Sequence, residues 1–167
     1  AVLISSLNQE DIMDFAKLFE DDNACTGWDG GCFLFACHEE NITISGEGVI
    51  YGQGDKVFID DDVDGGAHEC PLSVTAFRPR TTFLEDVTNL TVRDITIQDA
   101  AFWTLHMAGC HHVRVQDIKI LNDVRGANND GIDPDCCKDV LITGCLVKTG
   151  DDAIVIKTTK PMTQRYG

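Results

Sequence analysis

A short run of alternating apolar and polar residues recurs along the second half of the chain and constrains its fold more than any other feature. Residues 90–97 (LTVRDITI) are echoed 23 positions later by residues 113–120 (VRVQDIKI). A third version, residues 140–147 (VLITGCLV), follows after a further 27 positions. An earlier version, residues 42–50 (ITISGEGVI), precedes the first by 48 positions, which fits one long repeat or two ordinary ones.

Repeats of this length, with strand-like patterns in place of helical ones, indicate a β-solenoid. Each copy alternates apolar and polar residues, as a strand does when one of its faces lies on a core. A single coil cannot bury its apolar face alone, so successive coils are expected to stack in parallel. The competing interpretation is a β-sandwich with regularly spaced strands, and three copies in register favour the solenoid. We therefore predict one all-β domain over residues 1–167, with its coils over residues 41–157.

Residues 1–40 are less regular. Residues 9–20 have apolar positions at nearly helical spacing and are expected to form a short helix or part of a long loop. Residues 25–37 are rich in glycine and aromatic residues, which indicates an insertion. At the other end, Ile154 and Ile156 would lie on an open coil edge, so we expect a truncated solenoid that continues beyond Gly167.

The repeat also predicts a cluster of carboxylates. If Ile132 and Ile154 are equivalent, Asp130 lies directly below Asp152, because adjacent parallel strands are about 4.8 Å apart. Asp151 adjoins this pair. Mutual repulsion is expected to raise the pKa of at least one of the three, as a general acid requires near neutral pH. The alternative is that each Asp simply occupies a turn, where this residue is common.

Five segments in register with the repeat resemble one family. They are residues 46–54 (GEGVIYGQG), 77–80 (FRPR), 101–106 (AFWTLH), 128–133 (NNDGID) and 150–157 (GDDAIVIK). They are similar to motifs of glycoside hydrolase family 28, which includes polygalacturonases and rhamnogalacturonan hydrolases, and the resemblance covers residues 41–157. The chain departs from the family at Tyr51, where Asp is usual, and at Asn129, where Thr is usual. It also lacks the family's downstream His loop and Arg-x-Lys segment.

The resemblance implies a right-handed parallel β-helix that cleaves pectic polysaccharide with inversion of configuration. Asp151 would be the general acid, and Asp130 and Asp152 would hold and activate the attacking water. In an inverting enzyme, acid and base stand about 6.5–9.5 Å apart to leave room for that water. No metal ion or other cofactor is expected.

The resemblance and the repeat also suggest residues that contact the sugar. Asn128 would shape the floor of the binding site, and Lys157 is one of few basic residues near the cluster in sequence. Trp103 is expected one coil below Asp130, with His106 beside it. A bracing role inside the solenoid is an equally good interpretation of both. The expected partners are a pectic polysaccharide or oligosaccharide and the remainder of the β-helix beyond Gly167.

Charge and hydropathy narrow the classes of partner. The formal net charge of −15 argues against nucleic acid, whose phosphates require a basic surface. It also repels an acidic polysaccharide at long range, so a uronate substrate needs local cations. No apolar run approaches the roughly 18 residues of a membrane span. The chain starts without a basic n-region, so a signal peptide is expected to be absent or already removed. We expect a secreted or extracellular protein, with a cytoplasmic location left open.

Cysteine and acidic motifs suggest weaker alternatives. The eight cysteines fit buried free thiols or one or two disulfides, and do not fix the compartment. Cys25, Cys32, Cys37 and His38 could form a zinc site, but their spacing is irregular and lacks a CxxC pair. Residues 60–66 (DDDVDGG) resemble the start of a calcium loop, but a solvated acidic turn is the preferred interpretation.

Two other functions compete with hydrolysis. A calcium-dependent lyase of the pectate-lyase type would use the carboxylates to hold Ca²⁺ and an arginine as base, and no lone arginine adjoins the cluster in sequence. A non-catalytic β-helix would bind carbohydrate without cleaving it.

Overall fold

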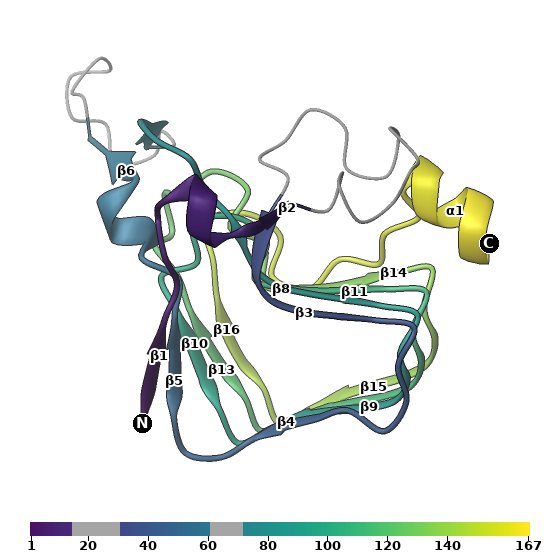
Figure 1. Ribbon diagram of the computed structural model, residues 1–167. Helices are drawn as coiled ribbons and strands as arrows, with labels where there is room; N and C mark the ends of the chain where they lie inside the picture. Colours follow the sequence, from purple (N-terminus) through teal and green to yellow (C-terminus); the bar gives the residue numbers. More distant parts are fainter. Residues whose placement is uncertain (15–30, 61–71) are drawn as a thin grey trace.

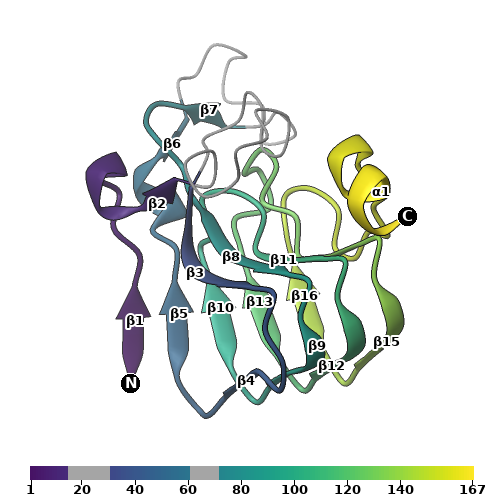
Figure 2. The same ribbon diagram turned by 45° about the vertical axis from the view of Figure 1, so that its right-hand side comes forward.

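The computed structural model describes residues 1–14, 31–60 and 72–167. Over these residues the chain winds through successive coils, each of which contributes one strand to each of three parallel sheets (Figure 1). Figure 2 shows the coils side by side, from the N-terminal coil to the one that precedes the C-terminal helix. The predicted right-handed parallel β-helix is confirmed.

The three sheets are named here by letter. Sheet A contains β1 (Val2–Ile4), β5 (Val49–Tyr51), β10 (Thr96–Gln98), β13 (Lys119–Leu121) and β16 (Leu146–Lys148). Sheet B contains β2 (Met13–Asp14), β3 (Gly31–Cys37), β8 (Arg80–Glu85), β11 (Leu105–Ala108) and β14 (Ile132–Asp135). Sheet C contains β4 (Thr43–Ser45), β9 (Thr88–Arg93), β12 (His111–Gln116) and β15 (Lys138–Thr143). Outside them lie η1 (Gln9–Asp11), η3 (Gly54–Lys56), the antiparallel pair β6 (Phe58–Ile59) and β7 (Ser73–Val74), and α1 (Lys160–Tyr166).

The register of the strands reproduces the spacing of the repeats. Val113 of β12 pairs with Leu90 of β9 and with Val140 of β15. These are the predicted offsets between the three copies. Thr43 of β4 pairs directly with Thr91 of β9, so the spacing between the earliest copy and the next is one long coil. The extra length of that coil includes η3, β6 and β7, which lie between sheets A and B.

A continuous apolar core lies between the three sheets. In β12, Val113 and Val115 are 1% and 0% exposed, whereas Arg114 between them points to solvent. Equivalent residues of neighbouring coils, such as Ile97 and Ile120, stack on one another in the core. Full burial of a side chain of this size contributes about 1.5–3 kcal/mol. The repeated apolar positions therefore supply the driving force for the stacking of the coils.

The corner between sheets C and A is turned by residues in the left-handed region. Asp94, Asp117 and Gly144 occupy equivalent places, with φ values of 60°, 51° and 66°. Asp tolerates this conformation better than most residues, and Gly adopts it without steric cost. At Gly144 a Cβ would also lie 2.1 Å from Oδ1 of Asp117. This position therefore accommodates only glycine without rearrangement.

Regular structure begins earlier in the chain than the sequence indicated. The segment 31–37, which we expected in an insertion, is β3, and it pairs in parallel with β8 as a strand of the first coil. Its Leu34 and Ala36 pack against the core, so its glycine and aromatic content concealed an ordinary strand. The predicted helix over residues 9–20 is reduced to η1 followed by β2 within the described residues, and residues 15–20 lie outside them. None of the described helices is long and apolar enough to cross a membrane.

Candidate active site

Two adjacent coils bring the predicted carboxylates together. Asp130 is separated from β14 by Gly131 alone, and Ile132 of that strand forms a parallel bridge with Ile154. The Gly131 amide donates a hydrogen bond to the Asp152 carbonyl over 2.9 Å, which seats the 150–153 turn on the start of β14. One oxygen from each of Asp130, Asp151 and Asp152 lies within 4.8 Å of the other two. The stacking predicted from the equivalence of Ile132 and Ile154 is confirmed.

The carboxylates stand close together. One oxygen of each carboxyl group lies no more than 4.8 Å from one oxygen of each of the other two. The separation of about 6.5–9.5 Å expected of an inverting acid and base refers to whole carboxyl groups. The stereochemical outcome therefore stays a prediction.

Asp130 is the buried member of the cluster and is 3% exposed, whereas Asp151 and Asp152 face solvent. Burial raises the pKa of Asp130, and the charge of Asp151 raises it further, while the Lys157 ammonium acts in the opposite direction. The sequence predicted a raised pKa from mutual repulsion. The direction is correct for Asp130, but burial is the larger cause.

Lys157 is directed toward these carboxylates. Its Nζ lies 2.8 Å from Oδ2 of Asp130 and 3.4 Å from Oδ1 of Asp133. Burial lowers the pKa of Lys157, but the hydrogen bond to Asp130 and the charges of both carboxylates outweigh this effect and raise it. The sequence suggested Lys157 as a contact for the sugar. The structure places its ammonium group beside Asp130 and Asp133, and a contact with the sugar stays a prediction.

Asp133 also lies in the site, although no role was predicted for it from the sequence. Its side chain is 0% exposed and lies beside the ammonium of Lys157. Burial and then the charge of Asp130 raise its pKa to about 8, against the opposing charge of Lys157. The available signal was its place on β14, in register with His106 of β11. That register puts both side chains on the outer face of sheet B.

Trp103 lies one coil below Asp130, as predicted. The Thr104 amide donates to the Asp130 carbonyl over 3.0 Å, which fixes this register. The Trp103 ring stacks on Phe102 with centroids 5.5 Å apart, and Nζ of Lys157 lies 4.2 Å from the Trp103 centroid. The guanidinium of Arg80 lies 4.9 Å from the same centroid. Trp103 therefore contributes to a platform of aromatic rings and cations beneath the carboxylates.

His106 is buried, which favours the structural interpretation over a sugar contact. It is 4% exposed and lies between the rings of Phe83 and Trp103, with centroid distances of 4.7 and 4.9 Å. Its Nε2 is 3.5 Å from Oδ2 of Asp135. Burial lowers the pKa of His106 to about 4, although Asp135 opposes this shift. The expectation that His106 touches substrate does not fit this position.

Asn128 connects the carboxylate cluster to a buried arginine. Its Nδ2 donates to Oδ2 of Asp151 over 3.4 Å, and its Oδ1 accepts from Arg78 over 3.0 Å. Arg78 also donates to the Ala127 carbonyl over 2.6 Å, so it fixes the turn before Asp130. The sequence pointed to Asn128 but not to the anchoring role of Arg78, whose partner lies 50 residues away.

Among the described residues, the three aspartates are the only group of His, Cys, Asp or Glu side chains close enough to share a metal ion. Lys157 already supplies Asp130 with a positive charge at 2.8 Å. The proposed zinc ligand Cys25 and residues 61–66 of the acidic loop lie outside the described residues. His38, another proposed zinc ligand, pairs with Asp86 over 2.7 Å. Cys37, Cys110, Cys136, Cys137 and Cys145 are free thiols, as one of the two cysteine interpretations expected.

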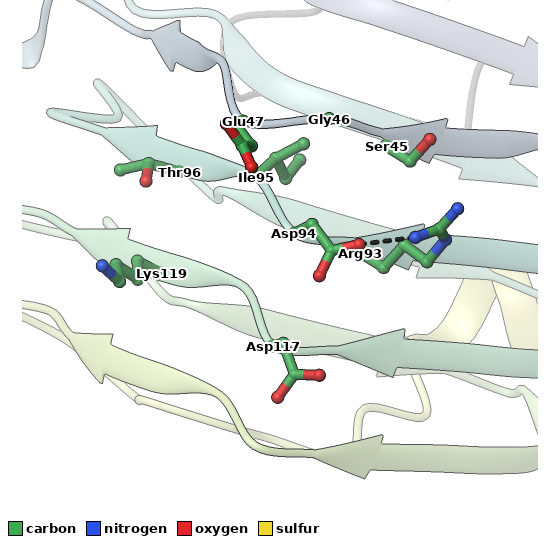
Figure 3. A pocket seen from close by; sticks show the side chains of 9 residues that line it. All are labelled: Ser45, Gly46, Glu47, Arg93, Asp94, Ile95, Thr96, Asp117 and Lys119. Carbon is green, nitrogen blue, oxygen red and sulfur yellow. Dashed lines mark hydrogen bonds and ion pairs between the residues drawn. The ribbon is translucent and has the colours of Figure 1, made fainter.

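A separate hollow of about 610 Å³ lies at the corner of sheets C and A, away from the turns that carry the aspartates (Figure 3). Its wall includes Glu47, Asp94, Asp117 and Lys119. Arg93, which also lines it, pairs with Asp94 over 2.6 Å. The hollow is open to solvent, and its charged side chains lie on the surface.

Comparison with known proteins agrees with this geometry. The chain is 29% identical over 126 residues to a probable polygalacturonase of Vitis vinifera, which covers 75% of this chain and 24% of the relative. It is 31% identical over 113 residues to an exopolygalacturonase of Oenothera organensis, which covers 68% of this chain and 30% of the relative. The chain thus spans about a quarter of the length of the first of these curated relatives.

Solved structures share the fold. The hyperthermoactive exopolygalacturonase of Thermotoga maritima superposes with a TM-score of 0.71 at 21% identity, over 99% of this chain and 43% of that one. The polygalacturonase of Erwinia carotovora ssp. carotovora gives a TM-score of 0.69 at 21% identity, over 92% and 42%. The sequence profile of "Glycosyl hydrolases family 28" matches residues 23–164. Together with the stacked carboxylates, this match shows that the chain belongs to glycosyl hydrolase family 28.

Proposed function

We propose that this chain carries the acid/base centre of a glycoside hydrolase that cleaves pectic polysaccharide with inversion. The observation that supports this most is the meeting of Asp130, Asp151 and Asp152 at the edge of two adjacent coils, with Lys157 bonded to Asp130. Nothing in the pairing of strands requires three carboxylates at one point, and repulsion between them costs stability. Catalysis is the function that uses such an arrangement.

In this proposal Asp151 protonates the oxygen of the leaving sugar. Its carboxylate is exposed and held from two sides, by Nδ2 of Asn128 and by the amide of Asp152, which donates to Oδ1 over 2.9 Å. Asp130 and Asp152 hold the water and accept its proton. Lys157 keeps Asp130 in the ionised form that a base requires, because an ammonium at 2.8 Å favours the carboxylate over the acid.

A pectic substrate is supported by family membership and by the names of the relatives. The chain's negative charge makes local cations necessary for binding a uronate. In the described part of the site, Lys157 contacts the Asp130 carboxylate. Arg78 donates hydrogen bonds to the Asn128 side chain and the Ala127 carbonyl. We propose that the cations that hold a uronate come from elsewhere in the protein. A polymer outside the cell as substrate also implies an extracellular location.

We further propose that another β-helical coil covers the upper edge of the one that ends at Lys157. Ile154 and Ile156 are 50% and 84% exposed, and Leu141 and Leu146 of the coil below are also open to solvent. An apolar hollow of about 400 Å³ runs along this edge between Val140, Ile142 and Ile156. A row of exposed apolar side chains of this kind is the surface on which the next coil of a solenoid stacks. Residues of that coil would complete the substrate site.

The test is Asp151→Asn in the protein expressed from its complete reading frame, assayed on polygalacturonate. We expect kcat to fall by about 10²–10⁴-fold, the usual contribution of a general acid, with substrate binding retained. Unchanged hydrolysis would refute the assignment of Asp151. Unsaturated products and loss of activity on chelation would indicate a lyase, and binding without turnover by the unsubstituted protein would indicate a non-catalytic β-helix.

A further inference from the structure

Asn129 lies next to the proposed base Asp130 and is buried. Its side-chain oxygen, side-chain nitrogen and backbone carbonyl each form a hydrogen bond. Its exposure is 0%. Its Oδ1 accepts a hydrogen bond from the Gly150 amide over 2.7 Å, and its Nδ2 donates to the Asp123 carbonyl over 2.8 Å. Its own carbonyl accepts from Nδ2 of Asn122 over 2.9 Å. A buried amide with every group satisfied is held in a single orientation.

The partners of Asn129 determine which way its amide points. An amide N–H of Gly150 can only donate, and the Asp123 carbonyl can only accept. The oxygen of Asn129 therefore faces Gly150 and its nitrogen faces Asp123. No hydroxyl or carboxylate at this position reproduces both contacts, because a carboxylate lacks the donor and a hydroxyl is too short to reach both.

These bonds join two turns that carry the proposed catalytic groups. Asn129 precedes Asp130 on one coil, and Gly150 precedes Asp151 on the next. The two turns also pack closely, since a Cβ on Gly150 would lie 2.4 Å from the Gly126 carbonyl oxygen. Within the upper turn, the Thr149 hydroxyl donates to the Asp151 carbonyl over 2.7 Å. A displacement at Gly150 therefore passes directly to Asp151.

Asn122 extends the same network to the coil below. Its Nδ2 also donates to the Thr104 hydroxyl over 2.8 Å, and its Oδ1 accepts from the Ala100 amide over 2.9 Å. Asn122 is 2% exposed. Three consecutive coils are thus connected by two buried amides on the inner side of the carboxylate cluster. Asn129 is the member of this network that reaches the coil of Asp151.

We propose that Asn129 is a positioning residue that sets the distance and orientation of Asp151 and Asp152 relative to Asp130. This inference rests on the proposed function, because it concerns the geometry of the same acid/base centre. Asn129 does not touch substrate and acts through Gly150. Asn129 can affect the reaction rate strongly, because misplacement of a catalytic group by about 1 Å can reduce the rate by about 100-fold.

The chain has Asn129 where the motif that it resembles usually has Thr. Thr, the residue usual in the motif, has one hydroxyl on its β-carbon and is shorter than Asn by one bond. It could accept from Gly150 or donate to Asp123, but not hold both at the distances seen here. The close packing of the 150 turn on the 123–126 turn is matched to the longer side chain.

The test uses three variants of the protein expressed from its complete reading frame, assayed on polygalacturonate with a urea unfolding midpoint for each. Asn129→Thr removes the double contact and keeps a polar side chain. Asn129→Asp is studied at acidic pH, where a buried carboxyl group keeps its proton and can accept from Gly150 and donate to Asp123. Tyr166→Phe is the matched control, because it removes a hydrogen bond to the buried Glu85 carboxylate, outside the network of Asn122 and Asn129.

We expect Asn129→Thr to lower kcat by about 10–100-fold with KM changed by less than about twofold. Asn129→Asp should recover most of the lost kcat at acidic pH. Tyr166→Phe should lower the unfolding midpoint to a similar extent and leave kcat unchanged. This split between kcat and KM is the signature of a group that positions the reacting residues.

Two results would overturn the inference. One is an Asn129→Thr variant with the kcat of the unsubstituted protein. The other is an equal loss of kcat in Tyr166→Phe at equal loss of stability, which would make Asn129 one stabilising residue among many. If the unsubstituted protein hydrolyses no pectic polymer, the proposed function fails instead, and the two failures are thereby distinguished.

Discussion

The Lys157 ammonium lies 2.8 Å from Oδ2 of Asp130 and 3.4 Å from Oδ1 of Asp133, between two buried carboxylates. Burial raises the pKa of both aspartates, and Lys157 opposes that shift in both. One cation thus controls the ionisation of the proposed base. The predictions below begin from this relationship.

Replacement of the cation, Lys157→Met, should reduce kcat and move the acid limb of the pH–rate profile to higher pH. The reason is that Asp130 would keep the effects of burial and of Asp151 on its pKa and lose the opposing charge. We expect the limb to move to higher pH and kcat to fall by about 10-fold or more at acidic pH. The measurement is kcat against pH on polygalacturonate.

Lys119→Met is the matched control, because it removes a lysine charge at the opposite corner of the coils. Its profile should superimpose on that of the unsubstituted protein. If Lys157→Met raised KM alone and left the limb in place, Lys157 would be a substrate contact, as the sequence first suggested.

Asp133→Asn should flatten the dependence of folding stability on pH. Burial raises the pKa of Asp133 from 3.8 to about 8, with Asp130 raising it further and Lys157 and Arg80 opposing the shift. The folded state therefore retains a proton that the unfolded chain releases above pH 4, and this contribution to stability is lost as pH rises toward 8. The variant carries no such group and keeps the shape of the side chain.

The check is urea unfolding of both proteins at about pH 5 and about pH 8. The unsubstituted protein should lose on the order of 1–3 kcal/mol more than Asp133→Asn over this range, since one pKa unit corresponds to about 1.4 kcal/mol. Parallel pH dependences in the two proteins would show that Asp133 is ionised in the folded state.

Arg165→Met should destabilise the attachment of α1 to sheet B. Arg165 donates to Oε1 of Glu85 over 2.7 Å, and the Tyr166 hydroxyl donates to the same oxygen over 2.8 Å. Glu85 is 1% exposed, so loss of the arginine leaves a buried carboxylate without its positively charged hydrogen-bond donor. We expect a cost of about 2–3 kcal/mol in unfolding free energy and faster hydrogen exchange over α1.

Arg93→Met supplies the comparison for that experiment. The Arg93–Asp94 pair is exposed on both sides, and its loss should change stability by less than about 0.5 kcal/mol. Equal effects of the two substitutions would mean that the α1 anchor behaves as a surface ion pair.

The effect of Ile156→Ser on stability should differ between two forms of the protein. In residues 1–167 alone, Ile156 is 84% exposed, and the substitution should leave stability within about 0.5 kcal/mol and reduce self-association. In the protein from the complete reading frame, a coil stacked on this edge would bury the side chain, and the substitution should cost about 2 kcal/mol or more. Neutral behaviour in both would remove support for the covering coil.

The sequence by itself determined the architecture of the coils. Strand periodicity and the spacing between Leu90, Val113 and Val140 predicted the register that the sheets show, because an apolar face must find its equivalent on the next coil. The same reasoning placed Asp130 under Asp152 and Trp103 under Asp130. These are consequences of backbone stacking, which a linear pattern encodes directly.

Only the tertiary structure decided the environment of each side chain. Glycine and aromatic residues concealed β3, which pairing with β8 makes a strand. The structure added Asp133 to the site, showed that Lys157 contacts Asp130 and Asp133, and showed that His106 is buried. The physical reason is that the outer face of sheet B carries these groups, and its burial depends on segments remote in sequence, such as Arg165, which reaches Glu85 across 80 residues. A sequence repeat determines which backbone segments stack. The ionisation and the contacts of a buried side chain depend on the other segments that pack over it.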